Sequence, residues 1–255
     1  SNKISKNFEK SEYDVLLSSG EQISCALLAG ALINLGLKSR SWMSWQIPIL
    51  TEGDHSSSRI KSVNKKEVIN YVNSGGIPII TGFQGISNNK RITTLGRGGS
   101  DATAISIAKF FGAEDCIIYT DVDGIYTTDP DINRNAKKIN KISYEEMLEM
   151  SSLGAKVMQP ISIQDAMIND ININVKSFFK NIKGTTISNK QNFSSKNIIT
   201  GIAFTKNEAK ITIIGVTDRP GIAASIFKPL ADNQINVDMV VQTSSPDGGQ
   251  TDITF

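Results

Sequence analysis

Histidine is almost absent from this chain of 255 residues, since His55 is the only one. It lies in the polar run 53–58, where we expect an exposed loop, so the sequence argues against a histidine base and against a histidine-rich metal site. Cysteine is nearly as rare. Cys25 and Cys116 lie in apolar surroundings without metal-ligand spacing, which predicts buried thiols in a reduced, cytoplasmic compartment.

Long apolar runs and an excess of one charge are also missing. We find no apolar run long enough to span a membrane, and the N-terminus has no signal-peptide core. The net charge is +2, and the basic residues are scattered rather than gathered in a stripe. We therefore expect neither a membrane nor a nucleic-acid partner.

Two common nucleotide-binding motifs are absent. The chain has no G-x-x-x-x-G-K-[ST] sequence, and Gly96-Arg97-Gly98-Gly99-Ser100 does not form a G-x-G-x-x-G motif directly after an apolar strand. A P-loop and a dinucleotide-binding turn are both excluded.

A glycine-rich loop leading into a helix is the most informative stretch of the chain. Gly96, Gly98 and Gly99 allow the backbone to approach a ligand, and the helix that follows Ser100 offers free N–H groups to an anion. Arg97 can form two parallel hydrogen bonds to a carboxylate or a phosphate. With Asp101 beside it, the loop suits phosphoryl transfer. The same residues also suit a plain helix cap and a tight turn.

Glu21 has two interpretations. Apolar residues repeat at helical spacing from Ile23 to Leu35, and Ser18-x-x-Glu21 satisfies the capping-box pattern, which places Glu21 in the first turn of this helix. The alternative is a carboxylate that faces the ammonium group of a ligand.

Helices and strands alternate along the first part of the chain. The pattern predicts helices over 64–74 and 102–111 and buried strands over 77–80 and 116–120, with a loop at 82–85 where open α/β sheets bind ligands. The expected fold is α/β, with a mainly parallel sheet covered on both faces.

A second polar loop, 120–130, follows the strand that ends at Thr120. It carries three acids, a tyrosine and several hydroxyl groups, which suit a nucleotide, whereas the spacing of an EF-hand calcium loop is absent. Ser143 and Glu146 form a second capping box at the start of a helix. Beyond that helix Lys156 lies in a short stretch of small residues, either as a surface lysine or as a neutraliser of phosphate.

The C-terminal part has a different pattern. A polar linker is expected over 189–197. The predicted elements beyond it are a strand over 210–216, a loop over 217–221, a helix over 222–232, a strand over 235–242, a turn over 246–249 and a strand over 251–255. This βαββ unit is most of a ferredoxin-like domain.

Taken together, these segments resemble the aspartate kinase family. The resemblance runs in order through Ser19 to Ser24, Gly82 to Gly85, Thr93 to Asp101, Tyr119 to Pro130, Gly154 to Lys156 and Thr217 to Gly221. It implies an amino-acid-kinase domain over 1–190, an αβα sandwich with a mainly parallel sheet, followed over 198–255 by an ACT regulatory domain. The implied reaction is ATP-dependent phosphorylation of L-aspartate to 4-phospho-L-aspartate in lysine, threonine and methionine biosynthesis.

The resemblance also implies site residues. Glu21 would hold the substrate ammonium, Arg97 the α-carboxylate, with Gly98, Gly99 and Ser100 in the same pocket, and Asp101 would be catalytic. ATP would contact Thr120, Asp121, Tyr126, Asp131 and Lys156, although many relatives carry arginine at the position of Asp131. Mg²⁺ would be carried on the phosphates. A feedback inhibitor, lysine or threonine, would bind Asp218, Arg219, Pro220, Gly221, Ile222, Ala223, Asn236, Val237, Asp238 and Gln242 in a homo-oligomer formed through ACT domains.

Two departures from the family pattern leave alternatives open. The family opens with a strand and a K-[FY]-G-G-[ST]-[ST] loop, and it carries a second ACT domain; neither is found here, so we expect a fragment that lacks both ends. The alternatives are a kinase of another small acidic substrate and a catalytically inactive amino-acid sensor.

Overall fold

The structure is a computed structural model that describes residues 7–155, 157–189, 199–204, 209–217, 219–233, 235, 237, 239–244 and 250–255. The chain divides into two compact units, Ser1–Phe204 and Thr205–Phe255, and each is described by itself. The linker expected over 189–197 lies almost wholly outside the described residues.

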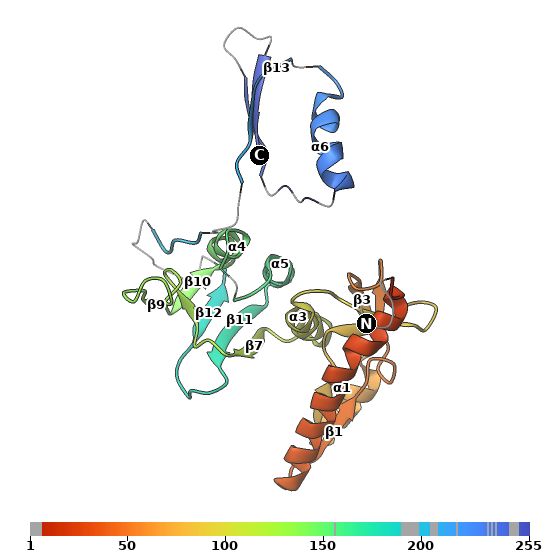
Figure 1. The fold of residues 1–255 in the computed structure, drawn as a ribbon. Coiled ribbons are helices and arrows are strands. Elements are labelled where there is room, and N and C mark those ends of the chain that lie inside the picture. The colour runs from red at the N-terminus through yellow and green to blue at the C-terminus, as the bar shows by residue number, and fades with distance from the viewer. Residues whose placement is uncertain are drawn as a thin grey trace. The chain divides into compact units, whose positions relative to one another are not determined.

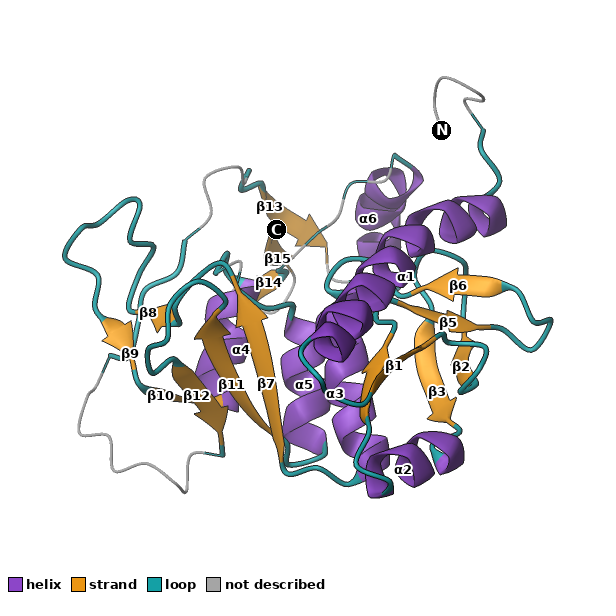
Figure 2. Cartoon of the chain, turned by 90° about the horizontal axis from the view of Figure 1, so that it is seen from below, coloured by secondary structure: helices purple, strands orange, loops and turns teal. Residues whose placement is uncertain are grey.

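The first unit is a mixed α/β structure (Figures 1 and 2). Its helices are α1 (Lys10–Asn34), α2 (Lys66–Asn73), α3 (Gly99–Phe111), α4 (Tyr144–Ser152) and α5 (Pro160–Ile168). Its strands are β1 (Ser39–Trp42), β2 (Ile49–Glu52), β3 (Arg59–Val63), β4 (Ile77–Ile80), β5 (Gln84–Ile86), β6 (Ile92–Thr94), β7 (Asp115–Thr120), β8 (Ile125–Tyr126), β9 (Lys138–Ile139), β10 (Lys141–Ser143), β11 (Asn172–Ser177) and β12 (Thr185–Ser188).

Strands that are joined across helices pair in parallel, and hairpin neighbours pair antiparallel. β1 pairs with β4, β7 with β11, and β10 with β12 in parallel, whereas β11 and β12 are antiparallel. A four-stranded sheet in the order β3-β2-β5-β6 lies between α1 and α3 in the sequence, and β8 pairs with β9. The α/β class expected from the alternating pattern is confirmed.

The local signals explain several boundaries. α3 is bracketed by Gly98 and Gly112, both left-handed with φ of 71° and 72°, a conformation that glycine adopts without strain. The capping box at α4 is confirmed, since Ser143 Oγ accepts from Glu146 N and Ser143 N donates to Glu146 Oε2. In β11, Ile173 and Val175 alternate with partly exposed residues and enter the main apolar core.

The start of α1 differs from the prediction. The helix begins at Lys10, so Ser18 and Glu21 lie in its interior, and Ser18 Oγ donates back to Val15 O. The capping box expected at Ser18 and Glu21 was therefore wrong. α1 is also long and apolar enough to cross a membrane by length and composition alone, contrary to the expectation, although a helix of a globular unit passes the same test.

Several described strands of the first unit lie at the edge of a sheet, and two of these, β4 and β7, line one apolar cavity. β4 pairs with β1 on one side and β7 with β11 on one side. An apolar cavity of about 350 Å³ is lined by residues of both strands, including Pro78, Ile80, Cys116 and Ile117, and by α3. The strands predicted at 77–80 and 116–120 are confirmed, but apart from the buried Cys116 their apolar side chains are partly buried or exposed.

The second unit is a three-stranded antiparallel sheet with one helix. The strand order is β13 (Thr212–Thr217), β15 (Gln250–Thr254) and β14 (Val241–Ser244), and α6 is Ile222–Asp232. The predicted βαββ order is confirmed. β14 begins at Val241 rather than at Ile235, and the turn predicted at 246–249 lies outside the described residues.

Candidate functional site

The glycine-rich loop connects β6 to α3. Gly99 N donates to Gly96 O at 3.1 Å, and Ala102 N donates to Gly98 O at 3.0 Å, so the chain turns tightly into the helix. Within the described residues no backbone acceptor faces the N–H groups of Ser100 and Asp101. These two free donors at the positive end of a helix are suited to an anion.

Arg97 is exposed and lies just before the N-terminus of α3. It makes no ion pair or hydrogen bond with any residue that the structure describes. Ser100 is also exposed. An unpaired guanidinium next to free backbone donors can bind a carboxylate bidentately without first breaking a protein contact.

Asp101 lies in the first turn of α3 and is partly buried. Burial raises the pKa of its carboxyl above the ordinary value of 3.8. Its charge in turn contributes to the raised pKa of Cys116 on β7, although burial of that thiol is the larger cause. The helix that carries Asp101 packs against β7, the strand that leads to the second polar loop.

The loop 82–85 packs against the glycine-rich loop. A Cβ atom on Gly99 would lie 2.8 Å from Phe83 Cδ2, and Leu95 N donates to Phe83 O at 3.0 Å. The buried Gln84 accepts from Gln22 Nε2 at 3.1 Å and donates to Ser18 O at 3.1 Å. Gln22 follows Glu21 in α1, so α1 and the glycine-rich loop both pack on this short segment.

Glu21 itself is half-buried in the middle of α1 rather than in a first turn. None of the contacts recorded among the described residues joins it to Arg97. Its assignment to a substrate ammonium stays a prediction, and so do the substrate assignments of Arg97, Gly98, Gly99 and Ser100.

The second polar loop lies at the carboxyl ends of the parallel strands β7 and β11. Thr120 and Ser177 are direct neighbours in the register, and Phe178 N donates to Thr120 O at 2.8 Å. Thr120 Oγ1 donates to Asp121 Oδ1 at 3.0 Å. The carboxyl ends of parallel strands are where α/β proteins bind ligands.

Tyr126, on β8, donates to Asp123 Oδ1 at 2.8 Å. This hydrogen bond, together with burial and the charge of Asp123, raises the pKa of Tyr126. Asp131 is exposed, and its N–H donates to Asp129 Oδ1. Of the predicted ATP contacts, Thr120 and Asp121 are joined by a hydrogen bond and Tyr126 lies in the same loop, whereas Lys156 lies outside the described residues. Their assignment to ATP stays a prediction.

Three residues of this region, Ser177, Phe178 and Phe179, were not singled out from the sequence. Ser177 Oγ accepts from Phe179 N and Lys180 N and shapes the turn after β11. Phe178 and Phe179 form an edge-to-face pair and are 75% and 77% exposed. Two adjacent aromatic residues and a lysine directly after a strand were the available signal, because exposed aromatic side chains often mark a binding surface.

In the second unit, the loop before α6 is described only in part. Arg219, Pro220 and Gly221 are exposed, and Gly221 has φ of 92° at the N-cap of the helix that begins with Ile222 and Ala223. Gln242 lies on β14, and Val237 is half-buried ahead of it. Asp218, Asn236 and Asp238 lie outside the described residues. Their assignment to an inhibitor pocket stays a prediction.

Comparison with known proteins places the chain in a family. The model of the amino acid kinase family matches residues 1–177, and the model of the ACT domain matches residues 210–255. The chain belongs to the amino acid kinase family. The second unit of this amino acid kinase is the part that carries the ACT match.

Similar proteins include aspartokinases from several bacteria. The chain is 44% identical to the aspartokinase of Corynebacterium efficiens over 248 residues, and 43% identical to the aspartate kinase of Pseudomonas putida over 245 residues. Each alignment covers 96% of this chain and 59% of the relative. The chain therefore spans well under two thirds of the length of these relatives.

Solved structures agree with this result. E. coli aspartokinase III in complex with aspartate and ADP matches with a TM-score of 0.73 and 28% identity, over 97% of this chain and 55% of that one. Aspartate kinase from Synechocystis matches with a TM-score of 0.64 and 34% identity, over 99% and 43%. This amino acid kinase thus has the fold of aspartokinases in both of its units.

Proposed function

We propose that the protein phosphorylates the side-chain carboxylate of L-aspartate with ATP, giving 4-phospho-L-aspartate and ADP. The observation that carries this proposal is the unpaired Arg97 beside the free N–H groups of Ser100 and Asp101. Together they form a site for an acidic ligand, and the similar E. coli enzyme has been crystallised with aspartate and ADP. The reaction belongs to lysine, threonine and methionine biosynthesis, in the cytoplasm.

The chemistry needs positioning more than a base. A side-chain carboxylate oxygen of aspartate attacks the γ-phosphorus of ATP, and the bond from that phosphorus to the bridging oxygen breaks as ADP leaves. Arg97 and the α3 N-terminus hold the α-carboxylate, and Glu21 holds the ammonium. Asp101 orients the groups around the transferring phosphoryl.

ATP binds across the carboxyl ends of β7 and β11, next to Thr120 and Asp121, and also contacts Tyr126, Asp131 and Lys156. Among the described residues no group of three or more histidine, cysteine, aspartate or glutamate side chains could hold a metal ion. We expect Mg²⁺, which neutralises phosphate charge, to be carried on the phosphates.

Regulation through the ACT unit is part of this proposal. The E. coli enzyme has also been crystallised with lysine and aspartate, and the matching structure has a TM-score of 0.72. We infer that lysine or threonine binds the loop before α6 together with Gln242, in a homo-oligomer paired through the open edges of the ACT sheet. In the full-length protein, Gln242→Ala weakens this inhibition and leaves the uninhibited kcat nearly unchanged. If the inhibition curves of the wild type and of Gln242→Ala were superimposable, this pocket would be excluded.

A comparison of acceptors in the full-length protein tests the activity. Aspartate is expected to be phosphorylated in preference to glutamate and UMP. Arg97→Ala raises the aspartate KM and lowers kcat/KM about tenfold to a hundredfold, since a charge-assisted contact contributes about 1.5–3 kcal/mol. Arg134→Ala, at an exposed arginine that follows the second polar loop in the sequence, is the matched control. Preference for glutamate or UMP would favour the alternative kinase, and no turnover at all would favour the amino-acid sensor.

The 255-residue chain by itself is expected to show little or no kinase activity. Charge stabilisation of the transferring phosphoryl group is the main source of rate in such reactions, and the K-[FY]-G-G motif of the family is not found in this sequence. Turnover by the purified chain equal to that of the full-length protein would contradict this expectation.

A further inference from the structure

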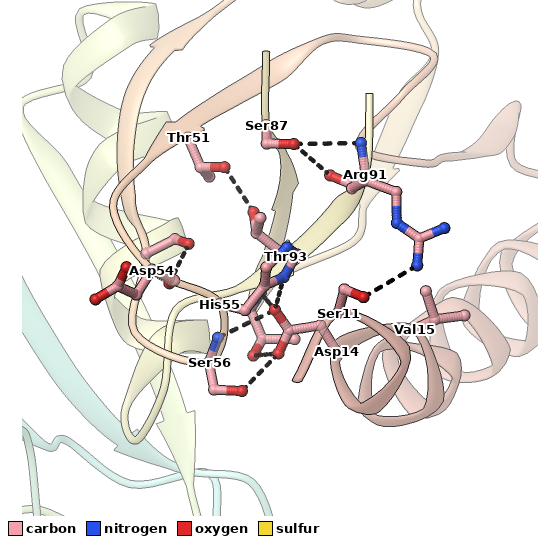
Figure 3. A network of polar contacts seen from close by, with 12 residues as sticks. Ser11, Asp14, Val15, Thr51, Asp54, His55, Ser56, Ser87, Arg91 and Thr93 are labelled. Carbon is pink, nitrogen blue, oxygen red and sulfur yellow. Dashed lines mark hydrogen bonds and ion pairs between the residues drawn. The ribbon is translucent and has the colours of Figure 1, made fainter. Parts of the chain in front are cut away.

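A buried carboxylate outside the predicted site connects three separate segments of the first unit. Asp14, on α1, has no exposed surface and accepts five hydrogen bonds. The donors come from His55 and Ser56, in the loop after β2, and from Thr94, the last residue of β6. Figure 3 shows Asp14 pointing from α1 toward His55 and Ser56.

The five bonds divide between the two carboxylate oxygens. Oδ2 accepts from His55 Nδ1 at 2.7 Å, Ser56 N at 3.0 Å and Thr94 N at 3.1 Å. Oδ1 accepts from Ser56 Oγ at 2.8 Å and Thr94 Oγ1 at 2.7 Å. Burial raises the pKa of Asp14, but the bonds from Thr94, His55 and Ser56 outweigh it, and the net pKa is lowered. Because an ionised carboxylate only accepts, His55 carries its hydrogen on Nδ1.

Thr94 and Ser56, two of the donors to Asp14, lie next to the glycine-rich loop. Thr94 is two residues before Gly96, so Asp14 fixes the backbone where the loop leaves β6. Ser58 N donates to Thr94 O at 3.1 Å and ties the two segments together again. A Cβ atom on Gly96 would lie 2.9 Å from Ser56 O, so the backbone that Asp14 holds is also the surface on which Gly96 rests.

The local backbone supports the same conclusion. Ser56 has φ of 68°, in the left-handed region that a serine rarely adopts, and both its N–H and its hydroxyl are bound by Asp14. A buried charge is a costly way to join three segments, since apolar packing would do so without desolvation. What the charge adds is a fixed geometry at Ser56 and Thr94.

We propose that Asp14, with His55 and Ser56, is a positioning unit that holds the Gly96–Asp101 loop in the form that binds the acidic substrate. Asp14 touches neither substrate nor nucleotide in this proposal and acts through Thr94 and Ser56. The proposal rests on the proposed function, because it assigns to that loop the recognition of aspartate.

The test uses the full-length protein and three variants. Asp14→Ala leaves five donors without their acceptor and is expected to raise the aspartate KM on the order of tenfold, with the ATP KM within twofold. Asp14→Asn restores most of the affinity, because its oxygen can replace Oδ2 while its amide group donates to the two hydroxyls. Ser56→Ala removes one bond, is expected to raise the aspartate KM about threefold, and serves if Asp14→Ala does not fold.

Glu12→Gln is the matched control. It removes a carboxylate from the same helix, where Glu12 pairs with Arg91 at the exposed surface. Hydrogen exchange of the amides of residues 94–99 is measured alongside the kinetics and does not depend on substrate. It is expected to be faster in Asp14→Ala and Ser56→Ala than in Glu12→Gln.

The outcomes separate the two proposals. One outcome is that Asp14→Ala or Ser56→Ala folds with a lower Tm and still matches Glu12→Gln in its aspartate KM and in the hydrogen exchange of residues 94–99. In that case the network is only structural and the positioning role is overturned. If the wild type does not phosphorylate aspartate, the proposed function fails. Faster exchange of residues 94–99 would then still support the positioning of the loop, and unchanged exchange would overturn it.

Discussion

Gly98, the last residue before α3, lies directly against Gln159, the last residue before α5. A Cβ atom added to Gly98 would overlap Gln159 Cγ and lie 2.8 Å from Gln159 Cβ. Rotation of the Gln159 side chain can move Cγ, but Cβ is fixed to the backbone, so the contact at 2.8 Å stays. The N-termini of α3 and α5 are therefore packed together next to the candidate substrate site.

Gly98→Ala is expected to destabilise the fold and to impair substrate binding. The left-handed conformation costs alanine about 1–2 kcal/mol, and the clash with Gln159 adds to it. Gly112→Ala is a matched control at the other end of α3, since Gly112 has φ of 72° and nothing within 4 Å of its Cβ position. Urea unfolding should show the larger loss for Gly98→Ala, and only that variant should raise the aspartate KM. Equal losses with unchanged KM values would show that the contact with Gln159 is unimportant.

Asp101→Asn is expected to abolish kinase activity while raising the Tm at neutral pH. Burial raises the folded-state pKa of Asp101 above 3.8, so the folded protein binds more protons than the unfolded chain above that pH. Stability then falls as the pH rises from 3.8 through the folded pKa. The gain in Tm should grow over this range and then level off. Glu114→Gln, at an exposed acid, is measured alongside as the control; a Tm gain of Asp101→Asn that is independent of pH would contradict the assignment.

The capping pattern shows what the sequence could and could not predict. Ser143-x-x-Glu146 begins α4 as expected, but the same pattern at Ser18 and Glu21 lies inside α1. Ser-x-x-Glu marks a helix start only if the preceding residues cannot be helical, and residues 10–17 continue the helix back to Lys10. Local patterns found most helices of the kinase unit and placed their ends less well.

Long-range contacts explain the residues that were missed. The hydrogen-bond partners of Asp14 lie 41, 42 and 80 positions further along the chain, and no local pattern indicates that pairing. His55 was expected to be an exposed loop residue; it lies in a loop, but its side chain is only 28% exposed because Asp14 binds it. The glycine-rich loop could be found from sequence because its chemistry is local, whereas its support comes from α1 and the loop after β2.

Both cysteines are expected to resist alkylation in the folded protein. Each is 8% exposed, and burial raises the pKa of Cys116 to about 11 and that of Cys25 above 9.0. At pH 8 a thiol of pKa 11 has about a hundredfold less thiolate than one of pKa 9.0, and thiolate is the reactive form. Mass spectrometry after iodoacetamide treatment should find both thiols unmodified until urea unfolds the chain. Rapid labelling of Cys116 without unfolding would contradict its burial.

Thr103 joins the two loops of the candidate substrate site. Its side chain is buried, and Oγ1 accepts from Phe83 N at 2.9 Å and donates to Gly99 O at 2.7 Å. Phe83 has φ of 66°, so the turn that carries it depends on this support. One hydroxyl therefore fixes the loop 82–85 to the first turn of α3.

Thr103→Val keeps the shape of the side chain and removes both hydrogen bonds. It leaves the amide of Phe83 unpaired and is expected to cost about 1–3 kcal/mol of folding free energy and to raise the aspartate KM. Thr103→Ser retains the hydroxyl and is the matched control, with a smaller loss from the missing methyl group and a KM near that of the wild type. Urea unfolding and steady-state kinetics on both variants measure the difference. If valine and serine gave the same KM, the link between Phe83 and Gly99 would not position the substrate site.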